Sequence, residues 1–446
     1  MPNWLHKVYW NAFTLWHFAA EARLPYRPLA KIHALQSRRV RALIRHAYET
    51  VPYYREVMDK GGLHPQDFHT AADLARLPIL TGDQLARDPE RFLSRRYAHG
   101  RSLQLHSSGT SGRLRKINYD AAALFLALAH GRRQRLVLAQ FVGRPFGYRS
   151  MVVSRPGSIG FLIHDFYRSY SLVPRSLSRA RNPLSPGNTL EDNLARLEAL
   201  KPEVLAGYGS YLGLLFRRAW ERHLPIFRPK AIVYGGDSLA DADRRLIEGE
   251  FAVPVVSAYQ AAEALHIAFQ CEQRQGFHIG LDYIAVRVVD RNGNSVGPGE
   301  TGEIIISNLT NRATVLLNYK QGDLVTLSAG PCPCGRTLPT IERIDGRADD
   351  LIALPDGQVI HSLVVLAPLH RVAGVIQVQL IQEDLHRFLL RAVCLGAKDW
   401  ALTSQELAAT LRALLGENIT VEIERVDAIP PQPNGKVKAV ISRCRP

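Results

Sequence analysis

A run of small hydroxyl and glycine residues is the segment of this sequence best suited to binding phosphate. It reads Ser107-Ser108-Gly109-Thr110-Ser111-Gly112, and Arg113, Arg115 and Lys116 follow at once. Backbone N–H groups and hydroxyls in such a run can surround phosphate oxygens. The run lacks the GxxxxGK[ST] spacing of the common phosphate-binding loop. Taken alone, it is more typical of a flexible linker.

Five more polar or glycine-rich segments follow it in a fixed order. They are Gly235-Gly236-Asp237, Tyr259-Gln260-Ala261-Ala262-Glu263, Tyr319-Lys320-Gln321-Gly322-Asp323, Gly346-Arg347-Ala348-Asp349-Asp350 and Asn434-Gly435-Lys436. The first two follow predicted strands. Each is weak alone, because Asp323 could cap a turn, Glu263 could be a surface carboxylate and Lys436 could be an ordinary solvated lysine. Lys438 also competes with Lys436 for any catalytic role.

In this order and spacing, the segments resemble the adenylate-forming superfamily of acyl-CoA synthetases, luciferases and peptide-synthetase adenylation domains. The stretches His46–Arg55, Leu77–Thr81 and Ile304–Arg312 are similar to the phenylacetate–CoA ligase branch. The resemblance extends from about Lys31 to Val440. It implies ATP-dependent activation of a carboxylic acid to an acyl adenylate with release of pyrophosphate. The acyl group would then pass to a thiol such as coenzyme A, or to an amine.

The resemblance also implies a role for each matching residue. The implied ATP-binding residues are Ser107, Ser108, Gly109, Thr110, Ser111 and Gly112 around the phosphates, Gly235, Gly236, Asp237 and Tyr259 near the adenine, and Asp323 at the ribose. The implied catalytic residues are Glu263, which would hold Mg²⁺, Arg347 near the ribose, and Lys436. Asp349 would be a hinge. Cations suit this chemistry, because a carboxylate must attack an α-phosphate that is itself negative.

Two departures from the family pattern leave the acceptor open. Gln260 stands where a glycine is usual, and Ala262 replaces the usual Ser or Thr, so one hydroxyl ligand is missing. The stretch Leu351–His361 looks less like the coenzyme A ligases than like the capsule-biosynthesis and deazaflavin-adenylating relatives. An enzyme that releases the adenylate, or forms an amide without coenzyme A, is therefore the alternative.

The cysteines suggest a metal site. Cys332 and Cys334, with Cys271 and His278 upstream, offer three thiolates and an imidazole, the ligands of a tetrahedral structural zinc ion. The C-x-C spacing is tighter than the usual C-x₂-C, and unrelated reduced thiols are the competing interpretation. Some relatives in the resembled branch look similar in carrying zinc at such a cluster. We therefore predict one structural Zn²⁺.

These residues require an α/β framework. Apolar runs such as 150–154, 231–234 and 253–258 alternate with helical patterns such as 190–200, which indicates βα units and parallel strands. Antiparallel strands are expected after Tyr283. We predict a large domain over 1–345 that binds ATP and the acid, and a small mobile α+β domain over 346–446 that carries the catalytic lysine.

Composition excludes some alternatives and leaves others open. With 446 residues, 46% of them hydrophobic, the chain is long enough for several folded domains. Five cysteines and no signal-peptide pattern favour the cytoplasm, and no apolar run could span a bilayer. A net charge of +15 suits nucleic acid or a membrane surface, but the excess is dispersed arginine. We predict no nucleic-acid partner.

The N-terminal segment is rich in aromatic residues, among them Trp4, Trp10 and Trp16. Such a segment fits a helix that packs on the main domain, which we favour, and also fits peripheral contact with a membrane. The resemblance makes a homodimer a further expectation. The identity of the carboxylic acid cannot be read from the sequence.

Overall fold

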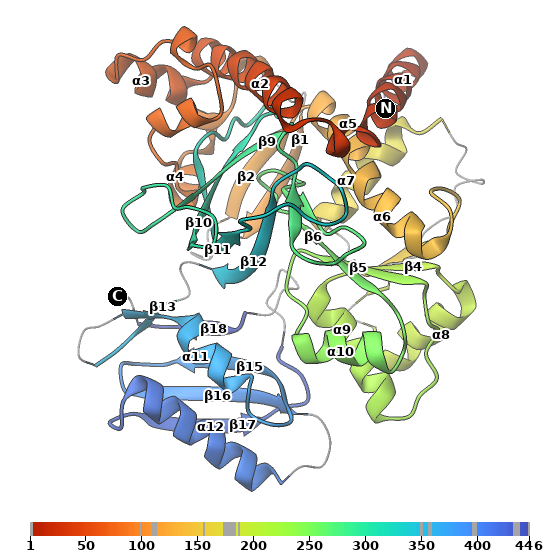
Figure 1. Cartoon of the computed structure of the whole chain (residues 1–446), viewed down its shortest axis with the longest axis vertical. Coiled ribbons are helices and arrows are strands. Elements are labelled where there is room, and N and C mark those ends of the chain that lie inside the picture. Colours follow the sequence, from red (N-terminus) through yellow and green to blue (C-terminus); the bar gives the residue numbers. More distant parts are fainter. Residues whose placement is uncertain are drawn as a thin grey trace. The chain divides into compact units, whose positions relative to one another are not determined.

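The computed structural model describes residues 3–98, 100, 102–108, 114–154, 157–172, 184–185, 188–347, 351–355, 359–394, 399–430 and 438–444 (Figure 1). The chain divides into two compact units. The first consists of residues 1–148, 154–182 and 256–344, and the second of residues 149–153, 183–255 and 345–446. Each unit is therefore built from segments that lie far apart in the sequence.

The first unit is organised around seven strands in the order β6-β7-β8-β12-β11-β10-β9. The strands are β6 (Val255–Tyr259), β7 (Ala268–Phe269), β8 (Phe277–Ile279), β9 (Ile284–Val289), β10 (Thr301–Asn308), β11 (Tyr319–Leu327) and β12 (Thr340–Arg347). The pairs β9–β10 and β10–β11 are antiparallel, as expected for the region after Tyr283. A separate antiparallel pair, β1 (Leu103–Ser108) and β2 (Leu114–Tyr119), leads into and out of the predicted phosphate loop.

Within the described ranges, the first unit has seven α-helices. They are α1 (Trp4–Glu21), α2 (Leu29–Thr50), α3 (Pro52–Lys60), α4 (Gly82–Arg87), α5 (Ala121–His130), α6 (Arg132–Val142) and α7 (Ile159–Tyr170). Short 3₁₀ helices cover Leu24–Tyr26, Pro65–Asp67, Ala72–Arg76, Pro89–Phe92 and Arg95–Tyr97. Pro52 ends α2, as its lack of an N–H predicts, and also occupies the first turn of α3, where that N–H is not needed.

The family-like stretch on α2 and α3 has a structural role here. His46 Nε2 lies 2.9 Å from the carbonyl oxygen of Arg312. The hydroxyl of the fully buried Tyr54 donates to Val315 O at 3.1 Å and accepts from Leu317 N at 2.8 Å. These contacts bind the two helices to residues 312–317, which lead directly into β11 and so help to position that strand.

The second unit contains the predicted parallel strands. β3 (Ser150–Val152), β4 (Val204–Gly207) and β5 (Ala231–Gly235) run parallel in that order. The helices are α8 (Leu190–Leu200), α9 (Gly209–Glu221) and α10 (Asp241–Gly249). Apolar residues of all six elements share one buried cluster, because each helix has one apolar face to bury against the strands.

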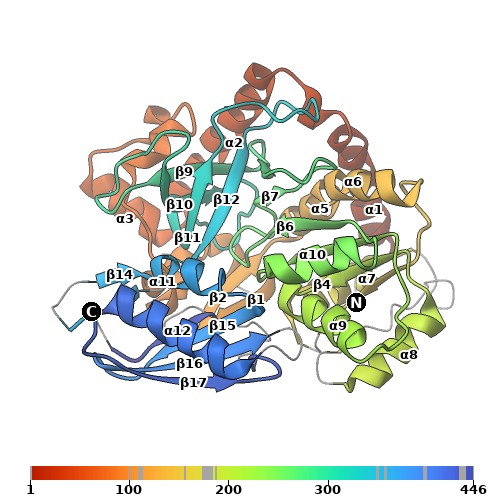
Figure 2. The same cartoon turned by 60° about the horizontal axis from the view of Figure 1, so that its bottom comes forward.

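The C-terminal part of this unit is a small α+β structure. Its four-stranded sheet has the order β17-β16-β15-β18, formed by β15 (Val375–Gln382), β16 (Arg387–Cys394), β17 (Thr420–Arg425) and β18 (Val440–Ser442). Helices α11 (Ser362–Leu369) and α12 (Trp400–Leu415) share a hydrophobic core with it, and Figure 2 shows α12 lying along the sheet. A two-stranded pair, β13 (Leu351–Ala353) and β14 (Val359–His361), precedes it.

The predicted fold class is confirmed: an α/β chain with parallel and antiparallel strands and a small α+β C-terminal part. A domain boundary at residue 345/346 stays a prediction, although the chain from Asp345 onward does fall in the second unit. No helix within the described ranges is both long and apolar enough to cross a lipid bilayer.

Candidate active site and metal centre

Glu263 lies at the centre of a buried polar cluster in the first unit. Its carboxylate Oε1 accepts from Ser107 Oγ at 3.1 Å and from Tyr319 Oη at 3.3 Å. Arg115 Nη1 lies 3.6 Å from the same oxygen and donates to Tyr319 Oη at 3.0 Å. Only 4% of the Glu263 side chain and 9% of the Arg115 side chain are exposed. Glu263 is therefore not the surface carboxylate that sequence alone left open.

The backbone around Glu263 is held as firmly as its side chain. Tyr119 Oη donates to the carbonyl of Ala262 at 2.7 Å, and Asn308 Nδ2 donates to the carbonyl of Glu263 at 3.1 Å. Since both donors come from strands, β2 and β10, the carboxylate is positioned by the sheet framework. A carboxylate held in this way needs to move little when it binds a cation, and such preorganisation favours binding.

Arg115 and Tyr319 belong to this cluster but were not named as site residues from the sequence. Both lie inside or beside recognised segments: Arg115 follows the phosphate-like run, and Tyr319 opens the segment that ends in Asp323. Gly82 makes room for Arg115, because a Cβ at Gly82 would lie 2.1 Å from the guanidinium carbon. The sequence signal that could have identified Arg115 and Tyr319 is that each is a polar side chain at the edge of a motif.

Tyr259 and Asp323 meet directly in the same unit. Tyr259 Oη donates to Asp323 Oδ2 at 2.5 Å, so the end of β6 is joined to the middle of β11. Gly322, before the aspartate, has a φ of +83°, a conformation that favours glycine. The predicted adenine and ribose residues are therefore neighbours, although they are 64 positions apart in the sequence.

The segment Gly235-Gly236-Asp237 closes β5 in the second unit. Gly236 has a φ of +85°, which turns the chain sharply at the end of the strand. The Asp237 carboxylate accepts from Gly209 N at 2.6 Å and from Ser210 Oγ, both in the first turn of α9. A negative charge there stabilises the helix N-terminus. Capping α9 is the role of Asp237 that the structure displays.

Several predicted site residues lie outside the described ranges: Gly109, Thr110, Ser111, Gly112, Asp349 and Lys436. Arg347 is the last residue of β12, and Ser108 is the last residue of β1. The structure does not describe their side chains. The roles inferred for these residues stay predictions.

Gln260 stands where the family usually has a glycine, and its Nε2 lies 3.2 Å from His266 Nδ1.

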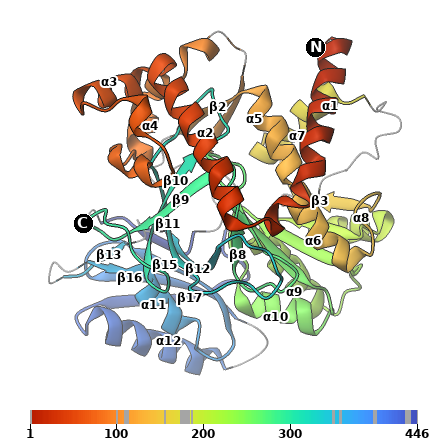
Figure 3. The same cartoon turned by 45° about the horizontal axis from the view of Figure 1, so that its top comes forward.

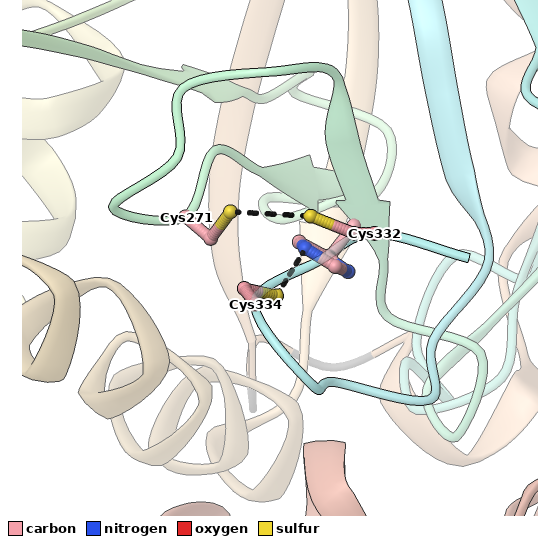
Figure 4. Close-up of side chains that lie close together, drawn as sticks. Cys271, Cys332 and Cys334 are labelled. Atoms are coloured by element: carbon pink, nitrogen blue, oxygen red, sulfur yellow. Dashed lines mark hydrogen bonds between the residues drawn. The ribbon is translucent and has the colours of Figure 1, made fainter.

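The four predicted metal ligands come together in the first unit. Their ligand atoms all lie within 4.8 Å of one another. Cys271 Sγ is 3.7 Å from Cys332 Sγ, and Cys334 Sγ is 3.3 Å from His278 Nε2 (Figure 4). Cys271 and His278 have no exposed surface. The cluster links the β7–β8 region to the turn between β11 and β12.

The donor set fits a zinc ion. Two thiolates on one tetrahedral Zn²⁺ lie roughly 3.8 Å apart, close to the spacing of Cys271 and Cys332. His278 Nδ1 lies 3.2 Å from Leu338 O, which favours a proton on Nδ1 and leaves the Nε2 lone pair directed at the cysteines. Burial lowers the pKa of His278 to about 4, so the ring is neutral near pH 7. Beside the cluster, Arg336 Nη1 donates to Glu272 at 2.9 Å.

Comparison with known proteins shows what this chain is similar to. Residues 352–443 match the family model described as the CapK C-terminal domain. The chain is 28% identical over 346 residues to a phenylacetate–coenzyme A ligase of Thermus thermophilus, a match that covers 73% of each protein. It is 22% identical over 418 residues to protein CapK of Staphylococcus aureus, covering 92% of this chain and 89% of CapK.

Solved structures agree on the fold. A 2-hydroxyisobutyryl-CoA ligase in the postadenylation state superposes with a TM-score of 0.73 at 18% identity, covering 94% of this chain and 91% of that one. An anthranilate CoA ligase bound to anthranoyl-AMP superposes with a TM-score of 0.51 at 15% identity, covering 75% of this chain and 65% of that one. The resemblance seen in the sequence is thus confirmed: the chain is a relative of the phenylacetate–CoA ligases and of CapK, with the fold of the adenylate-forming acid ligases.

Proposed function

We propose that this protein activates a carboxylic acid with ATP, forms an acyl adenylate and releases pyrophosphate, and then transfers the acyl group to a thiol or an amine. The observation that carries this proposal is the buried Glu263 carboxylate beside Ser107, at the end of the strand that leads into the phosphate-like run. A buried carboxylate next to a phosphate-like run can bind a cation, and the contacts with Ser107, Tyr319 and Arg115 hold it in place.

In this proposal Glu263 would hold Mg²⁺, which would supply positive charge to offset that of the phosphates. Within the described residues, the three contacts of the carboxylate all reach Oε1, so Oε2 is the oxygen assigned to the metal. Arg115 then adds a fixed positive charge next to the phosphates. Asp323, aligned by Tyr259, accepts from the ribose hydroxyls. Gly235 and Gly236 border the adenine, and Lys436 stabilises the transition state from the C-terminal part.

The molecule that receives the acyl group is the hardest part of the proposed reaction to infer from the relatives, because they do not all name an acceptor. The similarity to the phenylacetate–CoA ligases supports coenzyme A as the acceptor, whereas the similarity to CapK and its C-terminal domain names no acceptor. We infer a thiol as the first candidate and an amine as the second. A homodimer and a hinge at Asp349 remain predictions from the family resemblance.

ATP–pyrophosphate exchange measured with a panel of aromatic and aliphatic carboxylic acids tests the first half-reaction. We expect exchange that depends on both Mg²⁺ and one class of acid. Coenzyme A or simple amines are then added to the active acid, and AMP release and the acylated product are measured. The absence of exchange with every acid, from a protein that binds ATP, would contradict the proposal.

We also propose that Cys271, His278, Cys332 and Cys334 bind one structural zinc ion. Four protein ligands leave no open position for water or substrate, so the ion acts as a cross-link and takes no part in the reaction. Elemental analysis of protein purified without chelator should give about one zinc per chain. Serine at both Cys332 and Cys334 should abolish metal binding and lower Tm by roughly 5–10 °C.

The matched control replaces the two cysteines outside the cluster, Cys394 and Cys444, with serine. This variant should keep both its zinc and its Tm. A zinc content that survives loss of Cys332 and Cys334 would show that the metal binds elsewhere.

A further inference from the structure

The N-terminal helix α1 is firmly attached by one of its faces. Trp10 stacks on Phe125 of α5, with ring centroids 4.9 Å apart and planes inclined by 11°. Asn11 Nδ2 donates to the carbonyl of Tyr170 at the end of α7 at 3.0 Å. Figure 3 shows α1 running beside α5 and α7 at the edge of the molecule. Packing on the main domain, the favoured interpretation of the aromatic residues, therefore accounts for this face.

A buried ion cluster holds the C-terminal end of the same helix. Arg133 Nε donates to Glu21 at 2.7 Å, and both of its Nη atoms donate to Asp282, at 2.9 and 3.0 Å. Arg39 Nη1 lies 3.5 Å from Asp282, and His130 Nε2 lies 3.7 Å from Glu21. The guanidinium of Arg133 bridges the carboxylates of Glu21 and Asp282, so arginine side chains already balance the negative charge of this cluster. With this anchor, α1 presents a fixed outer face.

That outer face is apolar along its length. Its large side chains are Leu5, Val8, Tyr9, Leu15 and Trp16, with exposed fractions of 67%, 36%, 58%, 69% and 80%. They follow one another at helical spacing, with Ala12 and Ala19 completing a stripe about 20 Å long. No charged side chain interrupts the stripe. A contiguous exposed apolar surface of this kind usually marks an interaction site.

The loop after α6 presents a further exposed aromatic side chain beside α1. Phe18, on α1, has its ring centroid 5.9 Å from that of Phe146, whose side chain is 53% exposed. The guanidinium of Arg132 lies over both rings, at 4.5 Å from Phe18 and 6.0 Å from Phe146. Arg144 precedes Phe146 by two residues and is exposed. Two elements thus present aromatic side chains with cations close beside them.

The charge around the stripe is strongly one-sided. The basic residues on α1, α5, α6, α7 and the loop 143–148, apart from the buried Arg133, are Lys7, Arg132, Arg135, Arg144 and Arg168. Among the same residues, all within the described ranges, Asp165 is the exposed acidic side chain, because Glu21 is buried. The helices and the loop beside α1 are therefore basic, as is the whole chain with its net charge of +15.

This charge distinguishes between occupants of the stripe. A symmetric contact with a second copy would bring two copies of the same basic neighbourhood together, and like charges repel. An anionic membrane surface attracts them, at about 1 kcal/mol for each Lys or Arg near the lipid headgroups. Tyr9 and Trp16 also suit that interface, because their rings can enter the apolar boundary while the O–H and N–H stay hydrated.

We propose that the apolar stripe of α1, together with Phe146, docks this protein onto the surface of a membrane that contains anionic lipid. The helix lies in the plane of the interface and does not cross the bilayer. This inference is independent of the acid-activating reaction, because none of its residues belongs to the proposed active site.

Co-sedimentation of the full chain with vesicles tests the proposal. Vesicles of phosphatidylcholine alone are compared with vesicles that also contain phosphatidylglycerol. We expect binding to the anionic vesicles that weakens as NaCl is raised. Trp16→Glu should bind roughly tenfold less tightly or worse, because a ring that would be buried is replaced by a charge that the lipid repels. Its Tm and pyrophosphate exchange should match those of the wild type.

Leu402→Glu is the matched control, because Leu402 is 65% exposed on α12, far from α1 in sequence. It should bind vesicles as the wild type does. Equal vesicle binding by Trp16→Glu and the wild type would overturn the proposal, as would no binding of the wild type to either vesicle. A wild-type dimer that Trp16→Glu converts to a monomer, with vesicle binding unchanged, would assign the stripe to a second copy instead.

Discussion

Replacing Glu263 with glutamine removes one negative charge from the proposed magnesium site while keeping the shape of the side chain. The amide oxygen can still accept from Ser107 and Tyr319, so the fold around the site should persist. Arg115, which is 9% exposed, loses the carboxylate 3.6 Å away, and we expect a stability loss of about 1–3 kcal/mol from that change.

The effect on catalysis should be larger than this structural cost suggests. Deleting one preorganised electrostatic group typically raises a barrier by about 3 kcal/mol, and we expect kcat/KM for ATP–pyrophosphate exchange to fall roughly a hundredfold to a thousandfold. Because Oε2 is the proposed metal ligand, the Mg²⁺ concentration for half-maximal exchange should rise as well. Tyr319→Phe removes one neutral donor to Oε1 and the hydroxyl that accepts from Arg115, but it keeps the carboxylate, so it should raise the barrier by only about 1 kcal/mol.

Glu303→Gln is the matched control. Glu303 is another largely buried glutamate on the sheet of the first unit, with 11% of its side chain exposed, and it pairs with Lys320 at 2.6 Å. Neutralising it should leave the exchange rate and the Mg²⁺ requirement unchanged. The reasoning is refuted if Glu263→Gln keeps the wild-type kcat/KM and the wild-type Mg²⁺ dependence, because the carboxylate would then be a purely structural group.

Three further predictions concern Lys436, the proposed catalytic lysine, and the buried ion cluster. Lys436→Ala should block exchange while ATP binding, measured by calorimetry, is retained; greater damage from Lys438→Ala would move the assignment two residues along. Asp282→Asn should lower the free energy of unfolding by about 3–5 kcal/mol in denaturant titrations, because it leaves Arg133 buried with one partner fewer. Burial raises the pKa of Glu21 to about 6, so the folded state holds this proton above the pH at which the unfolded chain releases it. The contribution of Glu21 to stability should therefore fall by about 2 kcal/mol as pH rises from about 4.5 to 6, and the difference between the wild type and Glu21→Gln across that range measures it.

Local pattern was enough to predict many of the elements. The helical repeat of residues 190–200 coincides with α8, and the apolar run 231–234 falls on β5. Periodicity predicts such elements because the pattern of apolar residues along one segment reflects the face that the segment must bury. The order of short motifs likewise pointed to the adenylate-forming ligases, because each motif is local and the order is a property of the chain.

What the local pattern could not supply is which distant residues meet. Ser107 and Glu263 are 156 positions apart, and Arg115 and Tyr319 are 204 apart. Arg115 and Tyr319 entered the site only once β2 and β11 were placed in space. The four zinc ligands could be proposed from the sequence as a chemically suitable set. Their convergence depends on the pairing of β8 with β12, which brings the ends of long loops together.

The type of fold, the resemblance to the adenylate-forming ligases and the inventory of chemical groups could be inferred from the sequence, because these follow from local periodicity and motif order. Only the tertiary structure decided that Glu263 is buried with two donors and a cation, that Asp237 caps α9, and that α1 has one anchored face and one exposed apolar face. The physical reason is that burial and pairing depend on contacts between segments far apart in the chain, and these contacts form only when the elements pack.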